Sequence, residues 1–215
     1  YKITEEEMEQ AVTAALGAGY RAFDTAYFYK NEIALGNALK KSDVPREDLF
    51  ITSKLWNDYQ GYDRTIEFFT KSIENLGTDY LDLFLIHWPC EADGLFIESY
   101  KAMEKLYEEG RIRAIGVCNF NQHHLEKLME ATEVVPAVNQ IEVHPNFNQQ
   151  ALQEYCDSHD IAVTAWMPLM RNRGLLEYDV ITKLAERYNK TPAQIVLRWH
   201  LSHNSRTGNY AGIRV

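Results

Sequence analysis

Six polar or aromatic residues stand at, or just after, the C-terminal ends of six separate hydrophobic runs. They are Asp24, Lys54, His87, Asn119, Gln140 and Trp166. Alternate residues of a strand share one face, so His87 continues a row that contains Leu83 and Leu85. In parallel α/β sheets, the carboxyl ends of the strands lie along one edge, where ligands bind. The spacing therefore predicts that these six side chains gather at one edge and act together.

Tyr29 follows Asp24 by five residues and, with Lys54 and His87, completes a group suited to proton delivery. A free phenol has a pKa of about 10, too high for an efficient acid at neutral pH. A neighbouring ammonium, such as that of Lys54, stabilises the phenolate and lowers this pKa, and the Asp24 carboxylate would hold the ammonium in place. A histidine can hydrogen-bond a carbonyl oxygen, so the four together suit protonation of a developing alkoxide. None of them supplies electrons, so a bound hydride donor must provide the other half of the reaction.

Strands and helices alternate along the chain. Strands are expected at 20–26, 49–55, 80–87, 112–118, 137–143 and 161–166, and helices at 4–17, 30–40, 62–76, 95–108, 124–132, 149–159, 180–188 and from 191 onward. Thr4, followed by Glu7, predicts a capping box, and Thr191 is the expected N-cap of the last helix. Helical crossovers require parallel strands, which leaves an open doubly wound sheet or a closed (β/α)8 barrel. An open dinucleotide-binding sheet should carry GxGxxG after its first strand, but Gly17-Ala18-Gly19 lacks the third glycine and follows a helix. The sequence therefore favours the α/β class with a (β/α)8 TIM barrel over the open doubly wound sheet.

Two strands of such a barrel are not accounted for. The first would precede Tyr1, and the eighth would follow the helix that ends near His203. We therefore expect one TIM-barrel domain, residues 1–215, that is incomplete at the N-terminus and between about 203 and 205.

The composition restricts the partners of the protein. Its 215 residues carry a net charge of −9, which disfavours nucleic acid and anionic membrane surfaces. No run approaches the roughly 18 apolar residues of a membrane span. Cys90, Cys118 and Cys156 show no CxxC spacing, so reduced thiols in a cytoplasmic protein are expected. The other histidines, including His123 and His124, lack HExxH or similar ligand spacing, so no metal is expected.

Five segments, in this order, resemble the signature motifs of the aldo-keto reductases. They are Gly19–Glu32 (GYRAFDTAYFYKNE), Ile51–Trp56 (ITSKLW), Leu85–Pro89 (LIHWP), Ile115–Phe120 (IGVCNF) and Val138–Pro145 (VNQIEVHP). The similarity runs from Tyr1 to about His203, and its nearest branch is the bacterial one with 2,5-diketo-gluconate reductases and morphine-dehydrogenase-like proteins. It implies a monomeric enzyme that reduces aldehydes or ketones to alcohols with NADPH, or with NADH as an alternative donor.

The resemblance also implies a role for each matching residue. Tyr29 would be the general acid, Lys54 would lower its pKa, and Asp24 would pair with Lys54. His87 would orient the substrate carbonyl in a pocket lined by Trp88, Tyr27 and Trp56. The residues contacting the cofactor would be Asp24, Cys118, Asn119, Gln140, Trp166, Met167 and Leu169. Among these, Asn119 and Gln140 would hold the nicotinamide carboxamide, and Trp166 would stack on the nicotinamide ring.

The sequence departs from the family pattern at two places. Cys118 stands where the family usually has serine, which weakens or replaces one hydroxyl contact to the carboxamide. The family's last strand carries a Pro-Lys-Ser-type segment that holds the ribose phosphate. Here His203 is followed by 204–208, which resembles the family's C-terminal tail instead.

Two other function classes stay open at this point. A regulatory protein of the same fold would bind the cofactor with vestigial activity, although all four polar residues are retained. An aldolase-type barrel would use Lys54 as a Schiff-base nucleophile, which Asp24 opposes by keeping that lysine charged.

Overall fold

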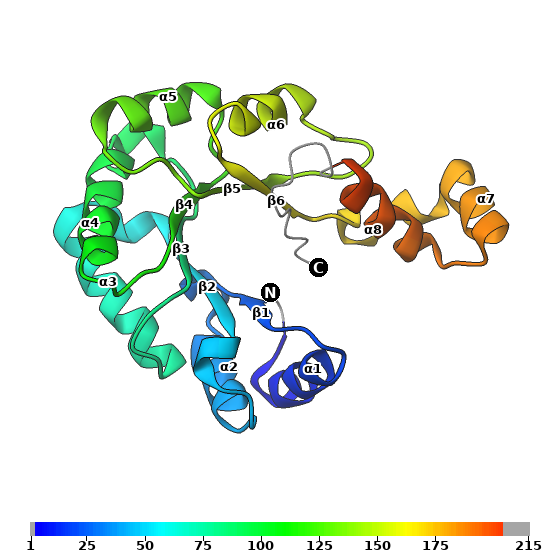
Figure 1. Ribbon diagram of the computed structural model, residues 1–215, viewed down its shortest axis with the longest axis horizontal. Coiled ribbons are helices and arrows are strands. Elements are labelled where there is room, and N and C mark those ends of the chain that lie inside the picture. The colour runs from blue at the N-terminus through cyan, green and yellow to red at the C-terminus, as the bar shows by residue number, and fades with distance from the viewer. Residues whose placement is uncertain (1–2, 204–215) are drawn as a thin grey trace. The chain divides into compact units, whose positions relative to one another are not determined.

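The computed structural model describes residues 3–203 and alternates strands with helices, as the hydrophobic pattern predicts (Figure 1). The strands are β1 (Ala22–Asp24), β2 (Phe50–Leu55), β3 (Leu83–Ile86), β4 (Ile115–Cys118), β5 (Val138–Glu142) and β6 (Ala162–Trp166). The helices are α1 (Glu5–Gly17), α2 (Glu32–Lys40), α3 (Tyr62–Leu76), α4 (Phe96–Glu108), α5 (Gln122–Ala131), α6 (Gln150–Asp157), α7 (Asp179–Tyr188) and α8 (Pro192–His203).

The elements fall into two compact units. The first comprises the chain up to Cys118 together with His124–Pro136, and it contains β1–β4 and α1–α4 with most of α5. The second comprises Asn119–His123 and the chain from Ala137 onward, and it contains β5, β6 and α6–α8. The predicted proton-delivery residues all belong to the first unit, and most of the predicted cofactor contacts belong to the second.

In the first unit, neighbouring strands pair in parallel and in chain order. The register sets Asp24 of β1 opposite Thr52 of β2, and Lys54 of β2 opposite Leu85 of β3. Because all four strands run in the same direction, their C-terminal ends lie along one edge of this sheet. The polar residues that end these strands are thereby carried to the same edge.

Helices of the first unit pack on one another and on the strands. Figure 1 shows α2, α3 and α4 in succession beside β2 and β3, and α2 contacts α3 while α3 contacts α4. Phe69 of α3 and Phe84 of β3 are fully buried, with ring centroids 5.4 Å apart. At the start of α1, Thr4 Oγ1 accepts from Glu7 N, and the Glu7 carboxylate accepts from Thr4 N. The predicted capping box is thus confirmed.

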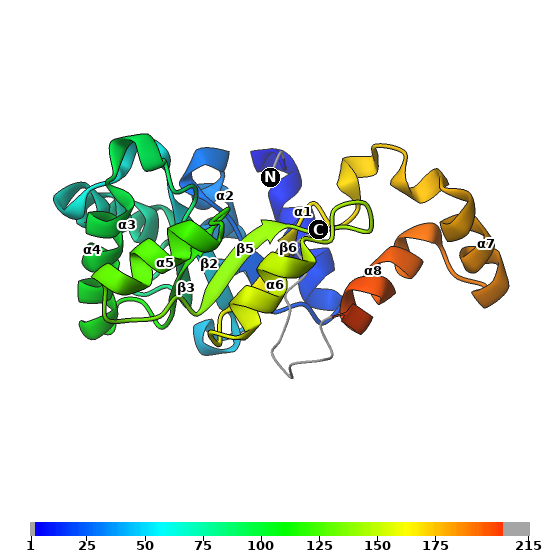
Figure 2. The same ribbon diagram turned by 90° about the horizontal axis from the view of Figure 1, so that it is seen from above.

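In the second unit, β5 and β6 pair in parallel, with Gln140 opposite Thr164. Helix α6 packs beside β6 (Figure 2). One hydrophobic cluster consists of Ile141, Val143 and Ala165, and another consists of Leu175, Ile181 and Val196. Thr191 Oγ1 accepts from Gln194 N at 3.2 Å, which confirms the predicted cap of α8.

Some predicted strands prove shorter in the structure. Strand β3 begins at Leu83 rather than residue 80, because Leu81 makes only an isolated bridge with Ile112. Strand β1 ends at Asp24, because Ala26 already caps a 3-10 turn, Tyr27–Tyr29. The expectations for the chain beyond His203 concern residues outside those described. None of the described helices is both long and apolar enough to cross a membrane.

Candidate active site

An ion pair between buried Lys54 and partly exposed Asp24 joins the ends of β1 and β2. The side chain of Lys54 has no exposed surface, and its Nζ lies 2.5 Å from Asp24 Oδ1. The same Nζ donates to the carbonyl oxygen of Thr25 at 2.8 Å. Since an unpaired ammonium is strongly disfavoured in a protein interior, Asp24 and the Thr25 carbonyl keep Lys54 in its charged form.

Tyr29 lies in the 3-10 turn that follows β1. This turn starts from extended backbone at Ala26 and ends at Lys30, whose φ of +55° reverses the chain. Lys54 Nζ lies 5.4 Å from the centroid of the Tyr29 ring. A positive charge near a phenol favours its phenolate form. The local geometry thus brings the phenol, the ammonium and the Asp24 carboxylate together.

His87 follows β3 directly. Its backbone N–H continues the sheet by donating to the carbonyl oxygen of Leu55 at 3.1 Å, and its side chain is 9% exposed. The centroid of its ring lies 5.8 Å from that of Tyr29, and the two rings are nearly perpendicular at 86°. The structure therefore places an imidazole beside the phenol.

Two further aromatic rings border this group. Trp56, just after β2, stacks on Phe28 with a centroid distance of 3.8 Å and an angle of 17°. The Trp56 ring also meets the His87 ring edge-on at 5.2 Å. Phe28 is 47% exposed, and the sequence analysis did not predict that it borders the site. Stacking between two loops leaves no periodic signal, and the position of Phe28 beside Tyr29 was the one available indication.

The two other residues predicted to line the substrate pocket face different surroundings. Tyr27 packs edge-on against Phe68 of α3, at 4.6 Å, and against Tyr59, at 5.6 Å. A hydrogen bond with Tyr27 raises the pKa of the Tyr59 hydroxyl. Trp88, the residue after His87, is 42% exposed. The structure thus turns Tyr27 toward α3 and leaves Trp88 accessible.

In the second unit, three of the residues predicted to contact the cofactor are linked to one another. Asn119 has a left-handed φ of +62°, and its N–H donates to the carbonyl oxygen of Gln140 at 3.0 Å. Trp166 Nε1 donates to Asn119 Oδ1 at 2.8 Å. Gln140 is 3% exposed. The Asn119 amide is thus bonded to the indole at the end of β6, and the Asn119 backbone is bonded to β5 at Gln140.

The remaining predicted cofactor contacts are a thiol and two loop residues. Cys118 ends β4 as a buried thiol in the first unit. Met167 follows β6 with a φ of +55°, and its carbonyl oxygen accepts from Met170 N at 2.8 Å. Leu169 packs against the cluster that contains Leu175. This loop is therefore tightly turned, and Leu169 contributes to the hydrophobic interior of the second unit.

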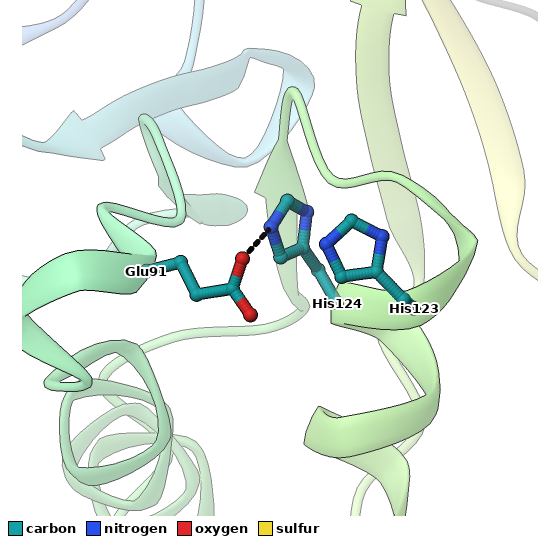
Figure 3. Close-up of side chains that lie close together, drawn as sticks. All are labelled: Glu91, His123 and His124. Atoms are coloured by element: carbon teal, nitrogen blue, oxygen red, sulfur yellow. Dashed lines mark ion pairs between the residues drawn. The ribbon is translucent and has the colours of Figure 1, made fainter.

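A carboxylate that the sequence did not connect to any histidine lies beside α5. Glu91, in the turn after β3, has Oε2 3.3 Å from His124 Nε2 (Figure 3). Lys127 Nζ pairs with the other oxygen of the Glu91 carboxylate. His123 precedes His124 in α5. Carboxylate and imidazole are groups of the kind that bind metal ions. The ligand atoms of Glu91, His123 and His124 lie within 4.8 Å of one another, and the Glu91 carboxylate also pairs with Lys127.

Comparison with known proteins decides the family. The family model described as the aldo/keto reductase family matches residues 1–214. The chain belongs to this family. Glyoxal reductase of Bacillus subtilis (strain 168) is 50% identical over 197 residues, which are 92% of this chain and 70% of that protein. Methylglyoxal reductase DkgA of Escherichia coli (strain K12) is 46% identical over 202 residues, 94% of this chain and 73% of that protein.

Solved structures of aldo-keto reductases also resemble this chain in fold. A mutant of Gox0644 crystallised in complex with NADPH has a TM-score of 0.89 and 44% identity, over 94% of this chain and 73% of that chain. These similarities confirm the predicted family, the α/β class and a partial (β/α)8 barrel. They also confirm the enzyme class, an aldo-keto reductase.

Proposed function

We propose that this aldo-keto reductase transfers a hydride from NADPH to an aldehyde or ketone, with Tyr29 as the general acid. The observation that carries the proposal is the fully buried Lys54 ammonium, bonded to Asp24 and 5.4 Å from the Tyr29 ring. The same ammonium also donates to the Thr25 carbonyl oxygen, which holds it at the end of β2. Beside a phenol it stabilises the phenolate left behind after proton transfer.

Each residue of the group then has a distinct part in the reaction. Tyr29 Oη donates its proton to the oxygen of the carbonyl that is being reduced. Lys54 stabilises the resulting phenolate, and Asp24 holds Lys54 in place. His87 hydrogen-bonds the same carbonyl oxygen and orients it, a role supported by the 5.8 Å between the ring centroids of His87 and Tyr29.

The amide cluster of the second unit fits the cofactor by its chemistry. A nicotinamide carboxamide has both donor and acceptor atoms, and Asn119 and Gln140 offer side-chain amides of the same kind. Trp166 adds an aromatic ring, fixed by its bond to Asn119 Oδ1. NADPH supplies the hydride when bound, and NADH is an alternative donor. These residues hold and orient the nicotinamide.

The substrate class follows from the relatives and from the rings around the site. Two relatives are named for glyoxal and methylglyoxal, so we propose small aldehydes and dicarbonyls as substrates. Trp56 and Phe28 offer stacked aromatic surface next to His87, with Trp88 exposed nearby in sequence. We further propose that residues 1–215 belong to one barrel domain and that the enzyme is a cytoplasmic monomer. Its reduced cysteines, Cys90, Cys118 and Cys156, suit that compartment.

The experiment is NADPH consumption by the protein with glyoxal, methylglyoxal and simple aldehydes, with the alcohol product quantified. We expect one alcohol formed for each NADPH oxidised. Tight NADPH binding without turnover on any of these carbonyls would instead support a regulatory protein of the same fold. Borohydride trapping of an aldehyde on Lys54 would support the aldolase-type reaction and contradict the reductase.

A further inference from the structure

A buried carboxylate lies behind the strand that carries Lys54. Glu32, the first residue of α2, is 2% exposed. Its Oε1 accepts from Ser53 Oγ at 2.6 Å and from Ser72 Oγ, and its Oε2 accepts from Asn75 Nδ2 at 3.1 Å. Glu32 thus ties the start of α2 to β2, through Ser53, and to α3, through Ser72 and Asn75.

The partners of Glu32 are neutral, which is unusual for a buried carboxylate. Among the described residues it forms no salt bridge, and its hydrogen bonds come from two hydroxyls and an amide. Burial raises the pKa of the Glu32 carboxyl, against the opposing effect of these bonds and of the Lys54 charge. A buried carboxylate without a charged partner does little for stability, so we look for a functional role for Glu32.

The chain between Thr25 and Glu32 is held at both ends by consecutive residues of β2. Ser53 and Lys54 point to opposite faces of the strand because side chains alternate. On one face Lys54 Nζ donates to the Thr25 carbonyl oxygen, and on the other Ser53 Oγ donates to Glu32. Tyr29 lies on the segment between these two attachments.

We propose that Glu32 is a positioning residue, whose hydrogen bond from Ser53 holds the Tyr29 segment in register with Lys54. The inference rests on the proposed reductase function. It gives α2 the role of holding the segment that carries Tyr29, although no residue of α2 is proposed to touch the substrate or cofactor. Lys54 fixes the segment where it leaves β1, and Glu32 fixes it where it enters α2.

The internal contacts of the segment transmit this restraint to Tyr29. Thr25 Oγ1 donates to Asn31 Oδ1 at 2.8 Å, which links the two ends of the segment directly. Asn31 is the N-cap of α2, next to Glu32. Because the turn at Tyr29 is closed by its N–H donating to the Ala26 carbonyl, a shift at Glu32 moves the phenol as well.

Helix α2, which carries Glu32, packs closely on α3. Gly36 is one turn after Glu32, on the same face of α2. A Cβ at Gly36 would lie 2.3 Å from the Leu76 carbonyl oxygen, next to Asn75. The backbones of α2 and α3 therefore approach so closely at Gly36 that only glycine fits there.

The test uses a matched pair of serine variants. Ser53→Ala removes the bond from Glu32 to the catalytic strand, whereas Ser72→Ala removes the equivalent bond to α3. Both side chains are fully buried and both donate to the same oxygen. We expect Ser53→Ala to lower the single-turnover rate of aldehyde reduction about tenfold, with KM for the aldehyde and NADPH affinity within about twofold. Ser72→Ala should keep the rate within about twofold of the wild type, with a comparable fall in melting temperature.

A conservative variant guards against a purely structural explanation. Glu32→Gln keeps an oxygen for Ser53 and Ser72, and Asn75 can rotate its amide to accept from the new NH2. Its rate should stay within about threefold of the wild type. The inference is overturned if Ser53→Ala turns over at the wild-type rate, or if both serine variants slow turnover equally. If the wild type itself does not oxidise NADPH with any carbonyl, the proposed function fails instead.

Discussion

The first unit contains two buried carboxylates that bond to the same strand, and their surroundings differ. Asp82, before β3, accepts from the backbone N–H of Ile51 in β2 at 2.9 Å. Arg46 and Arg113 pair with it at 2.8 and 3.2 Å. Glu32 bonds β2 only two residues later, at Ser53, and has neutral partners alone.

This difference separates supporting structure from chemistry along one strand. Asp82 lies near the start of β2 and satisfies its charge with two guanidinium groups, an arrangement that stabilises. Glu32 and Lys54 lie toward the C-terminal end, where a buried ammonium and a weakly compensated carboxylate are retained. In barrels of parallel strands the C-terminal ends carry the reaction and the N-terminal ends carry stability. The two carboxylates bond β2 only two residues apart, at Ile51 and Ser53, and follow that division.

The largest effect should come from removing the ammonium at the reactive end. Lys54→Met should lower kcat/KM for aldehyde reduction by about 100-fold or more, as expected when a general acid loses the charge that assists it. Lys41→Met, which removes an exposed lysine paired with Glu9, is the control. Steady-state kinetics on both variants checks this. A Lys54→Met enzyme with wild-type kcat/KM would contradict the division of β2 into an end that supports stability and an end that supports chemistry.

At the other end the effect should fall on stability. Asp82→Asn keeps an oxygen for the Ile51 N–H but loses the charge that pairs with Arg46 and Arg113. Because Arg46 and Arg113 are partly exposed to water, the free energy of unfolding should fall by about 2 kcal/mol, less than for a fully buried ion pair. Urea denaturation measures this, and kcat/KM of the folded enzyme should stay within about twofold. A loss of activity without a loss of stability would contradict the division.

A comparable effect on stability is expected from the helix contact that positions Glu32. Gly36→Ala places a Cβ 2.3 Å from the Leu76 carbonyl oxygen, so α2 must shift. Overpacking of this kind costs about 1–3 kcal/mol, and turnover should fall as well because the shift reaches Tyr29. Gly17→Ala, where a Cβ meets nothing within 4 Å, is the matched control. Thermal unfolding and turnover of both variants decide whether the close approach matters.

The smallest effect is a pH dependence of stability. Burial raises the pKa of Glu32 above its ordinary value of 4.5, so the native state holds this proton more tightly than the unfolded chain. Its contribution to stability is therefore complete below about pH 4.5 and is lost as pH rises through the native pKa. Glu32→Gln does not titrate, so its unfolding free energy relative to the wild type should increase between about pH 4 and pH 7.

Glu7 provides the opposite case for the same measurement. Its hydrogen bonds with Thr4 lower the pKa of this exposed carboxyl, so its contribution is present above pH 4.5 and is lost as pH falls. Glu7→Gln should therefore show the reverse trend in urea denaturation at the two pH values. Equal trends for both variants would show that burial does not distinguish Glu32.

Sequence reasoning reached the strand ends because their signal is local. The alternation in β2 and β3 predicted that Lys54 and His87 end rows on one face, and the bounds of α3 were predicted as observed. The Glu32 network could not be predicted, since Ser53, Ser72 and Asn75 come from two elements whose packing no single segment encodes. Phe28 on Trp56 was missed for the same reason.

The central claim is that Tyr29 delivers the proton, and one measurement tests it most directly. NADPH oxidation by an aldehyde is followed in a single turnover with the wild type, with Tyr29→Phe, and with Tyr107→Phe on the surface of α4 as the control. The account predicts that Tyr29→Phe binds NADPH within about threefold of the wild type but turns over at least about 100-fold more slowly. Tyr29→Phe turning over at the rate of Tyr107→Phe would contradict it.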